Sequence, residues 1–511
     1  MPTNKQNNIK IGGNVLTSGG FGCLFRPALK CKNTLNYARS DKNFVTKLMT
    51  KKHAKTEFKQ INEFKSILDH IPNYQNYFLV DNFSICEPAE LTSDDLDDFD
   101  DECSALKKNK FTAKNINDNL GKILALNMPD GGVDVDDYLF AIKDKDLIVP
   151  TYIDLNISLV DLLVNGISPM NQARLYHCDI KGSNILVKLD EETEETNTRL
   201  IDWGLSVYLK GTNRNNRHNR NNRNIPDNLN RRPFQFNVPF SVILFNKKFT
   251  EKYEIFLKRH QTLNFFSIRE FVVNYIFFWN KIRGPGHLKT INSIVRILTY
   301  GELPAVENKK VKDHVIEYEF TYYYIVEYIS RILFKYTVSG KLNLFDYFNN
   351  VFLKNIDVWG LTMTYMEFID NLQSHYHNDD SNELNDSHIH FIDKIKQIII
   401  HFLFENSTEV IDIKRLAIEL QSLNKLIAKF DANGRGAGDN EINGINGNRT
   451  NRDNYLNSLT RIVEEDVIEI GGGNYKRNPI TTNKSKRINK GQMNTKNKGT
   501  NKQSKTRKAK H

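Results

Sequence analysis

Strand-like runs gather near the start of this chain, and helix-like patterns dominate the rest. Residues 14–26, 44–49 and 77–83 are short and rich in apolar and β-branched side chains, which favours strands. Residues 55–71 place their large apolar side chains three and four apart, which indicates one helix face. Further helical patterns cover 253–282, 313–336, 357–373, 388–405 and 409–430. This order predicts an α+β fold, with a small β-rich lobe before a larger, mostly helical lobe.

Charge is spread unevenly over the 511 residues, whose formal net charge is +10. Residues 470–511 hold 13 Lys and Arg and no acidic residue, so residues 1–469 carry a net charge of −3. The whole segment 431–511 has few large apolar residues, and we expect it to be disordered, as we do the Asn/Arg-rich stretch 210–232. The basic tail predicts binding to nucleic acid or another polyanion, although a solubilising role explains it equally well.

The cysteines and the N-terminus predict a place inside the cell. The chain has five cysteines and no CxxC pair, so we expect neither a disulfide framework nor a zinc cage. That pattern fits a reducing compartment. The first ten residues are polar, and no apolar run of 18 residues is free of charge, so we expect neither secretion nor a transmembrane segment. The five cysteines are Cys23, Cys31, Cys86, Cys103 and Cys178.

The strongest chemical signal is the polar loop, residues 177–186 (HCDIKGSNIL). It supplies a carboxylate at Asp179, an ammonium at Lys181 and an amide at Asn184. Phosphoryl transfer uses such groups to take a hydroxyl proton, to offset phosphoryl charge and to bind magnesium. Asp202, in the sequence LIDWG, follows 23 residues after Asp179 and offers a second magnesium ligand.

A glycine-rich segment precedes these groups in the chain. We name it the glycine turn; it comprises Leu16, Thr17, Ser18, Gly19, Gly20, Phe21, Gly22, Cys23 and Leu24. Glycines let backbone N–H groups approach phosphates closely. Lys47 follows within an apolar strand, where a lysine is costly unless it is paired. Its expected partners are phosphates and a helix glutamate; we favour Glu63, with Glu57 as the alternative.

In this chain order, the motifs together resemble those of the eukaryotic-type serine/threonine protein kinase family. Residues 124–132 resemble the strand and hinge of that family, where Leu126 would be the gatekeeper and the backbone of Asn127 and Met128 would meet the adenine. Asp357 resembles the start of the family's central helix. The wording CDIKGSN and MPDGG is similar to that of serine/threonine kinases of giant viruses of the mimivirus type.

The resemblance implies a bilobal protein-kinase-like fold with insertions. Its expected parts are a kinase domain over 12–430, divided into an N-lobe (12–126), a hinge (127–132) and a C-lobe (133–430), with an acidic insertion at 86–118 and a large insertion at 210–355.

The resemblance also implies ATP and Mg²⁺ as cosubstrate and cofactor, and Ser or Thr hydroxyls of proteins as acceptors. The implied catalytic residues are Asp179, Lys181 and Asn184; the implied nucleotide contacts are the glycine turn, Lys47, Glu63, Asn127 and Met128; and the implied metal ligands are Asn184 and Asp202. If the chain is viral, it would act in the host cytoplasm or in the virion.

Three departures from the family pattern keep alternatives open. Cys178 stands where the family has an arginine, Trp203 stands for a phenylalanine, and no Ala-Pro-Glu is present; the nearest anchor is in residues 236–240. One alternative is therefore a pseudokinase, a scaffold that binds partners without turnover. The other is a small-molecule kinase, which uses a similar loop. Lys181 and Asp357 favour a protein kinase over the latter.

Overall fold

A computed structural model describes residues 14–32, 43–142, 144–189, 195–209, 225–260, 262–300, 317–377 and 384–430. The chain divides into two units, Met1–Asp439 and Asn440–His511, and the second lies wholly outside the described residues. The basic tail, which we predicted to be disordered, therefore lies outside the described residues. Residues 210–224 of the Asn/Arg-rich stretch lie outside them as well.

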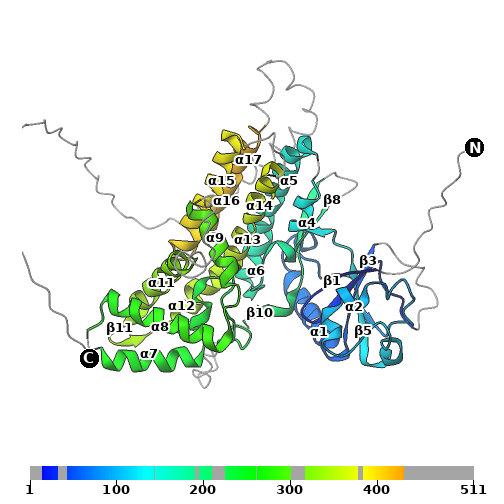
Figure 1. The fold of residues 1–511 in the computed structure, drawn as a ribbon, viewed down its shortest axis with the longest axis horizontal. Helices are drawn as coiled ribbons and strands as arrows, with labels where there is room; N and C mark the ends of the chain where they lie inside the picture. The colour runs from blue at the N-terminus through cyan, green and yellow to red at the C-terminus, as the bar shows by residue number, and fades with distance from the viewer. Residues whose placement is uncertain are drawn as a thin grey trace, which may run out of the picture. The chain divides into compact units, whose positions relative to one another are not determined.

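The N-terminal part of the described chain is an antiparallel sheet of five strands in the order β1-β2-β3-β5-β4 (Figure 1). The strands are β1 (Asn14–Ser18), β2 (Gly22–Arg26), β3 (Phe44–Thr50), β4 (Ser84–Cys86) and β5 (Ile123–Pro129). Helix α1 (Lys51–Leu68) follows β3 directly. The strand expected at 77–83 does not join this sheet, because the backbone of Tyr77 and Leu79 bonds to Leu200 instead.

The two faces of the sheet are covered by different segments. On one face, Met49 and Leu126 share a core with Ile61 and Phe64 of α1. On the other face, Leu48 shares a core with the acidic insertion, residues 86–118. The buried side chains of that second core include Phe25, Ala125, Phe99 and Leu106. The insertion is therefore packed on the sheet, through α2 (Phe99–Glu102) and α3 (Ser104–Lys107).

The remainder of the described chain is mostly helical, so the coarse expectation of a β-rich start and a helical remainder is confirmed. The short helix η2 (Asn117–Lys122) comes directly before β5. The first elements after β5 are β6 (Val133–Asp134), α4 (Val135–Phe140), α5 (Ile148–Asp161), η4 (Leu162–Ile167), α6 (Ser168–Gln172), β7 (Leu175–Tyr176), η5 (Gly182–Asn184), β8 (Ile185–Leu189), β9 (Thr196–Leu200), η6 (Trp203–Leu205) and β10 (Val207–Tyr208). Strands β8 and β9 pair antiparallel.

The elements after β10 are helices with one short hairpin. They are η8 (Phe240–Leu244), α7 (Lys247–Arg259), α8 (Phe265–Arg283), α9 (Leu288–Tyr300), α11 (Glu317–Tyr336), β11 (Thr337–Val338), β12 (Lys341–Leu342), α12 (Leu344–Tyr347), η10 (Phe348–Phe352), α13 (Leu353–Met363), α14 (Met366–His377), α15 (Asp386–Ile399), η11 (Ile400–Phe404), α16 (Ile413–Gln421) and α17 (Leu423–Ile427). Most side chains of α13 are buried, which places this helix at the centre of the helical core.

One described segment, Ile148–Gln172, is long and apolar enough to cross a membrane by length and composition alone. It runs through α5, η4 and α6. Its Tyr152 is fully buried, and the Tyr152 hydroxyl donates to Asn371 Oδ1 at 2.7 Å. These contacts are typical of a core helix, which is consistent with the expected absence of a transmembrane segment.

The expectation that the cysteines form no disulfides is wrong. Cys23 is bonded to Cys103, and Cys31 to Cys86, which leaves Cys178 as a buried thiol. The sequence separations of 80 and 55 residues carry no motif, so only the packing of the acidic insertion on the sheet brings the partners together. The cysteine pattern therefore no longer supports a reducing compartment.

Candidate functional site

A cleft of about 480 Å³ takes in residues from both the sheet and the helical remainder. Of the residues expected at the site, it is lined by Thr17, Ser18, Gly19, Gly20, Gly22, Leu24, Lys47, Met128, Lys181, Asn184 and Asp202. Segments far apart in the sequence therefore meet at one place.

Some expected site residues lie outside this lining. Leu16 and Phe21 are exposed, and the Phe21 ring stacks on His53 with centroids 4.8 Å apart. The Asn127 side chain accepts from Thr46 Oγ1 at 2.5 Å and lies against two cysteine sulfurs. Met128, two residues beyond Leu126 on the same strand, does line the cleft.

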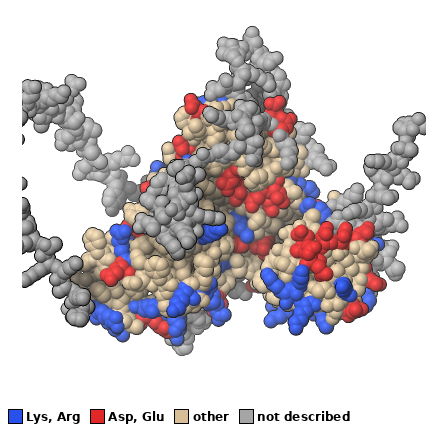
Figure 2. Space-filling model, in the orientation of Figure 1, with Lys and Arg blue, Asp and Glu red and all other residues tan. Residues whose placement is uncertain are grey.

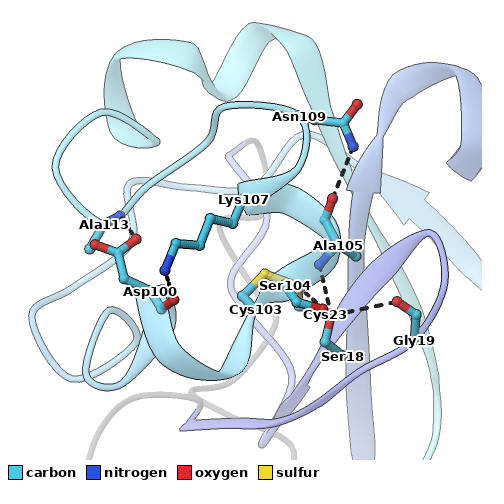
Figure 3. Close-up of a disulfide and its surroundings, with 10 residues drawn as sticks. All are labelled: Ser18, Gly19, Cys23, Asp100, Cys103, Ser104, Ala105, Lys107, Asn109 and Ala113. Atoms are coloured by element: carbon cyan, nitrogen blue, oxygen red, sulfur yellow. Dashed lines mark hydrogen bonds between the residues drawn. A yellow bond between two sulfur atoms is a disulfide. The ribbon is translucent and has the colours of Figure 1, made fainter.

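The glycine turn joins β1 and β2 and is tied to the acidic insertion at both ends (Figure 3). At its start, the Ser18 hydroxyl accepts from the backbone N–H of Ala105 at 2.9 Å. At its end, Cys23 forms the disulfide with Cys103. Within the turn, the Gly19 N–H donates to the Gly22 carbonyl at 2.9 Å. The turn thus has fixed ends, with glycines between them.

Lys47 pairs with Glu57, and the expected pairing with Glu63 is wrong. Lys47 Nζ lies 2.8 Å from Glu57 Oε1, and the two side chains are 16% and 13% exposed. Helix α1 begins at Lys51, four residues earlier than the sequence pattern predicted. Its buried face runs through Ala54 and Ile61, so Glu57 points to the sheet while Glu63 is exposed.

Asp202 completes a group of charges with this pair. Burial alone would lower the pKa of Lys47, but Glu57 and Asp202 raise it above its ordinary value. Burial also acts to raise the pKa of Asp202, yet Lys47, and after it His177, hold that pKa below its ordinary value. Asp202 is therefore an ionised carboxylate at the cleft, and Lys47 is an ammonium beside it.

The polar loop is fixed by Asp357 at the start and by Asn184 at the end. The fully buried Asp357 carboxylate accepts from the backbone N–H of His177 at 2.8 Å and from that of Cys178 at 2.7 Å. Asn184 Nδ2 donates to the Asp179 carbonyl at 2.8 Å and to Asp179 Oδ2 at 3.2 Å. Because the nitrogen side of the Asn184 amide faces Asp179, its oxygen Oδ1 is the side left for another partner.

Two polar side chains that were not among the expected site residues also reach this loop. They come from residues 228–240, which we name the bracing segment. Arg232 Nη1 donates to the Cys178 carbonyl at 2.5 Å, and Asn237 Nδ2 donates to Asp179 Oδ1 at 2.9 Å. Their signal in the sequence is weak: Arg232 lies between Arg231 and Pro233, and Asn237 lies between two apolar residues. The neighbouring His287 has a pKa lowered by burial and by Lys181, against the opposing charge of Asp179.

Acidic side chains gather over α4 and α14 (Figure 2). Burial, with Asp134 and Asp137, raises the pKa of Asp136 to about 6. Burial, with Asp136 and Asp370, raises the pKa of Glu367 to about 8. A Cβ added to Gly182 would lie 1.9 Å from Asp136 Oδ1, so the loop and the cluster are in close contact.

The predicted magnesium ligands fit a metal that is held mainly by phosphates. Among the described residues, no three or more His, Cys, Asp and Glu side chains are grouped to hold a metal ion. Asp202 offers an ionised carboxylate whose oxygen Oδ1 accepts only a long bond of 3.4 Å from the Gly204 N–H among described groups, and Asn184 offers an amide oxygen. Magnesium commonly takes one or two protein ligands together with substrate phosphates and water.

Comparison of the chain with protein-family models and with curated proteins finds no match.

Proposed function

We propose that this chain is a protein kinase that transfers the γ-phosphoryl group of ATP to Ser or Thr hydroxyls of protein substrates. The observation that carries the proposal is that one cleft takes in the glycine turn, the Lys47–Glu57 pair, Asn184 and Asp202. A bilobal kinase-like arrangement, with the sheet as the small lobe and the helical remainder as the large one, belongs to the same proposal.

In this proposal, each charged group has a separate task. Lys47, oriented by Glu57, binds the α- and β-phosphates, while the backbone N–H groups of the glycine turn cover them. Asn184 and Asp202 bind Mg²⁺, which, when bound, offsets the charge of the β- and γ-phosphate oxygens. Asp202 suits this task because its carboxylate is ionised.

The remaining groups act on the acceptor side. Asp179 orients the substrate hydroxyl and accepts its proton as the oxygen attacks phosphorus. Lys181 offsets the charge of the transferred γ-phosphoryl group, and its place two residues after the base favours Ser and Thr over Tyr by resemblance to the family. Action in a host cell or a virion stays a prediction, as does polyanion binding by the basic tail.

The test is a transfer assay with the full, oxidised chain. Purified protein is incubated with labelled Mg-ATP and with basic and acidic protein substrates, beside Asp179→Asn. We expect labelled Ser and Thr with wild type, and a rate at least about 100-fold lower with the variant, because a general base contributes that much. Acid hydrolysis of the labelled product identifies the acceptor residue.

Other results distinguish the alternatives. Equal labelling by wild type and by Asp179→Asn would exclude a kinase that uses this site. No labelling, combined with a higher melting temperature in ATP, would favour the pseudokinase scaffold. Transfer to aminoglycosides or choline without transfer to protein would favour the small-molecule kinase.

A further inference from the structure

The bracing segment bonds to three consecutive residues of the polar loop. Arg232 donates to the Cys178 carbonyl, and Asn237 Nδ2 donates both to Asp179 Oδ1 at 2.9 Å and to the Ile180 carbonyl at 3.2 Å. The proposed base therefore lies between two bonded neighbours and is itself bonded.

Arg232 is a buried cation whose burial has an identifiable role. The residue is 5% exposed, and besides the Cys178 carbonyl its guanidinium donates to the carbonyl of Asn228 and to Gln235 Oε1. A buried charge is costly unless it is paired and bonded. The buried Asp357, whose carboxylate holds the polar loop, is the nearby opposite charge: burial raises the pKa of Asp357, and Arg232 is among the groups that oppose this.

The Cys178 backbone needs such support. Its φ of 63° lies in the left-handed region, which is unfavourable for a residue with a side chain. Asp357 holds its N–H at 2.7 Å, and Arg232 holds its carbonyl at 2.5 Å. Both ends of this strained residue are thus fixed, and the direction in which the chain enters Asp179 is fixed with them.

Asn237 fixes the direction of the carboxylate itself. It bonds to Asp179 Oδ1, while Asn184 bonds to Asp179 Oδ2 at 3.2 Å, so each carboxylate oxygen has its own amide donor. Asn237 is 1% exposed, so water does not compete for this bond. Rotation of the carboxylate would break both bonds.

The bracing segment is anchored in turn by residues of three helical regions. Trp279 Nε1 of α8 donates to the Arg232 carbonyl at 3.2 Å, and Trp359 Nε1 of α13 donates to the Phe236 carbonyl at 2.9 Å. The His287 N–H, just before α9, donates to the Phe234 carbonyl at 2.8 Å. The predicted insertion 210–355 therefore contributes directly to the site.

We propose that Arg232 and Asn237 are positioning residues, which hold Asp179 in its working geometry from the bracing segment. This rests on the proposed function. Cys178 offers no charge to read a phosphate, and the carbonyl that Arg232 holds lies just before Asp179. The chain therefore orients its base through its own buried arginine and amide.

The test compares Arg232→Ala, Arg232→Lys and Asn237→Leu with the control Arg231→Ala, whose residue is the exposed neighbour. We expect kcat to fall about 10- to 100-fold in the first and third variants, because small misplacements of a reacting group cost that much. The KM for ATP should stay within about twofold, because the nucleotide contacts are elsewhere. Arg232→Lys, or methylguanidinium added to Arg232→Ala, should restore part of kcat.

A full kcat in Arg232→Ala and Asn237→Leu would overturn the proposal, as would equal losses in kcat and ATP affinity. Hydrogen exchange of the amides in residues 177–180 supplies a second measurement. Exchange should be faster in both variants than in Arg231→Ala, and unchanged exchange would also overturn the proposal. If wild type transfers no phosphate, the proposed function fails, and exchange alone then decides whether the brace exists.

Discussion

The glycine turn and the polar loop face the same cleft, yet different kinds of contact hold them. The acidic insertion holds the glycine turn through the buried Cys23–Cys103 disulfide and a bond from the Ala105 N–H to the half-buried Ser18 hydroxyl. The polar loop is held from the interior by Asp357, Arg232 and Asn237. A disulfide responds to reductants, whereas a buried polar contact responds to the loss of either partner.

The free space around the glycine turn also differs from that around the polar loop. An added Cβ at Gly20 would meet nothing within 4 Å, so the middle of the glycine turn has space to move. In contrast, a Cβ at Gly360 would lie 2.4 Å from the Ile180 carbonyl, so α13 is in close contact with the polar loop. We infer that the turn is the adjustable part of the site and the polar loop is its fixed part.

Asp357→Ala should have the largest effect, because it removes the central contact of the fixed part. The backbone N–H groups of His177 and Cys178 would lose their acceptor inside the protein. We expect the free energy of unfolding to fall by about 3–5 kcal/mol, as for a broken buried pair. Urea denaturation, followed by the fluorescence of the three tryptophans, measures it.

The control for this prediction is Asp393→Ala. Asp393 is exposed on α15 and lies 3.6 Å from Lys396 Nζ. A surface pair of this kind contributes less than about 1 kcal/mol. Equal losses in the two variants would mean that Asp357 does not fix the polar loop.

Removal of the Cys23–Cys103 disulfide should have the next largest effect, and it should act on the glycine turn. Cys103→Ser frees the end of the glycine turn from the acidic insertion. We expect the free energy of unfolding to fall by about 2–4 kcal/mol. We also expect the KM for ATP to rise more than kcat falls, because the turn covers the nucleotide. Dithiothreitol should reproduce this effect on wild type.

The control here is Cys86→Ser, which removes the other disulfide but leaves the glycine turn tied to Cys103. It should lower stability with a smaller rise in KM. Thiol titration in denaturant should count one thiol before reduction, Cys178, and five after it. Five thiols without reduction would show that neither disulfide is present.

Glu57→Gln should have a smaller effect, which Glu63→Gln should lack. Glu57 is the partner of Lys47 at 2.8 Å, whereas Glu63 is exposed on the same helix. We expect kcat/KM to fall about tenfold in Glu57→Gln, which corresponds to about 1.4 kcal/mol for a charge-assisted bond. Similar losses in both variants would show that the helix as a whole, and not this pair, sets the rate.

The Lys47–Glu57 pair also shows which features of α1 could be predicted from the sequence and which could not. The period of α1 was correctly predicted, because Ile61, Phe64 and Leu68 recur at helical spacing. The start of α1 was not, because Thr50 at its N-cap makes no side-chain capping bond. Glu57 already lay within the expected helix, so the helical period left both glutamates open as partners of Lys47.

The Cys23–Cys103 disulfide and the contacts of Arg232 were not predicted, and the reasons are related. Motifs with fixed local spacing, such as those around Asp179 and Lys47, can be read along the chain. The disulfide partners are 80 residues apart, and Arg232 is 54 residues from Cys178. Contacts of this kind depend on how the insertions pack, which no local pattern records.

Glu367→Gln should give the smallest effect, and one that depends on pH. The pKa of Glu367 is raised to about 8 by burial and by Asp136 and Asp370, and Glu367 Cγ lies 3.4 Å from a Cβ built on Gly182 of the polar loop. Between its ordinary pKa, near 4.5, and about 8, the folded state binds a proton that the unfolded state has lost. Wild-type stability should therefore fall as pH rises through this window.

Glu367→Gln cannot ionise, so its melting temperature should rise relative to that of wild type from pH 5 to pH 9. Glu254→Gln, at an exposed position of α7, should follow wild type. A constant difference between Glu367→Gln and wild type would mean that the acidic cluster does not bear on the fixed part of the site.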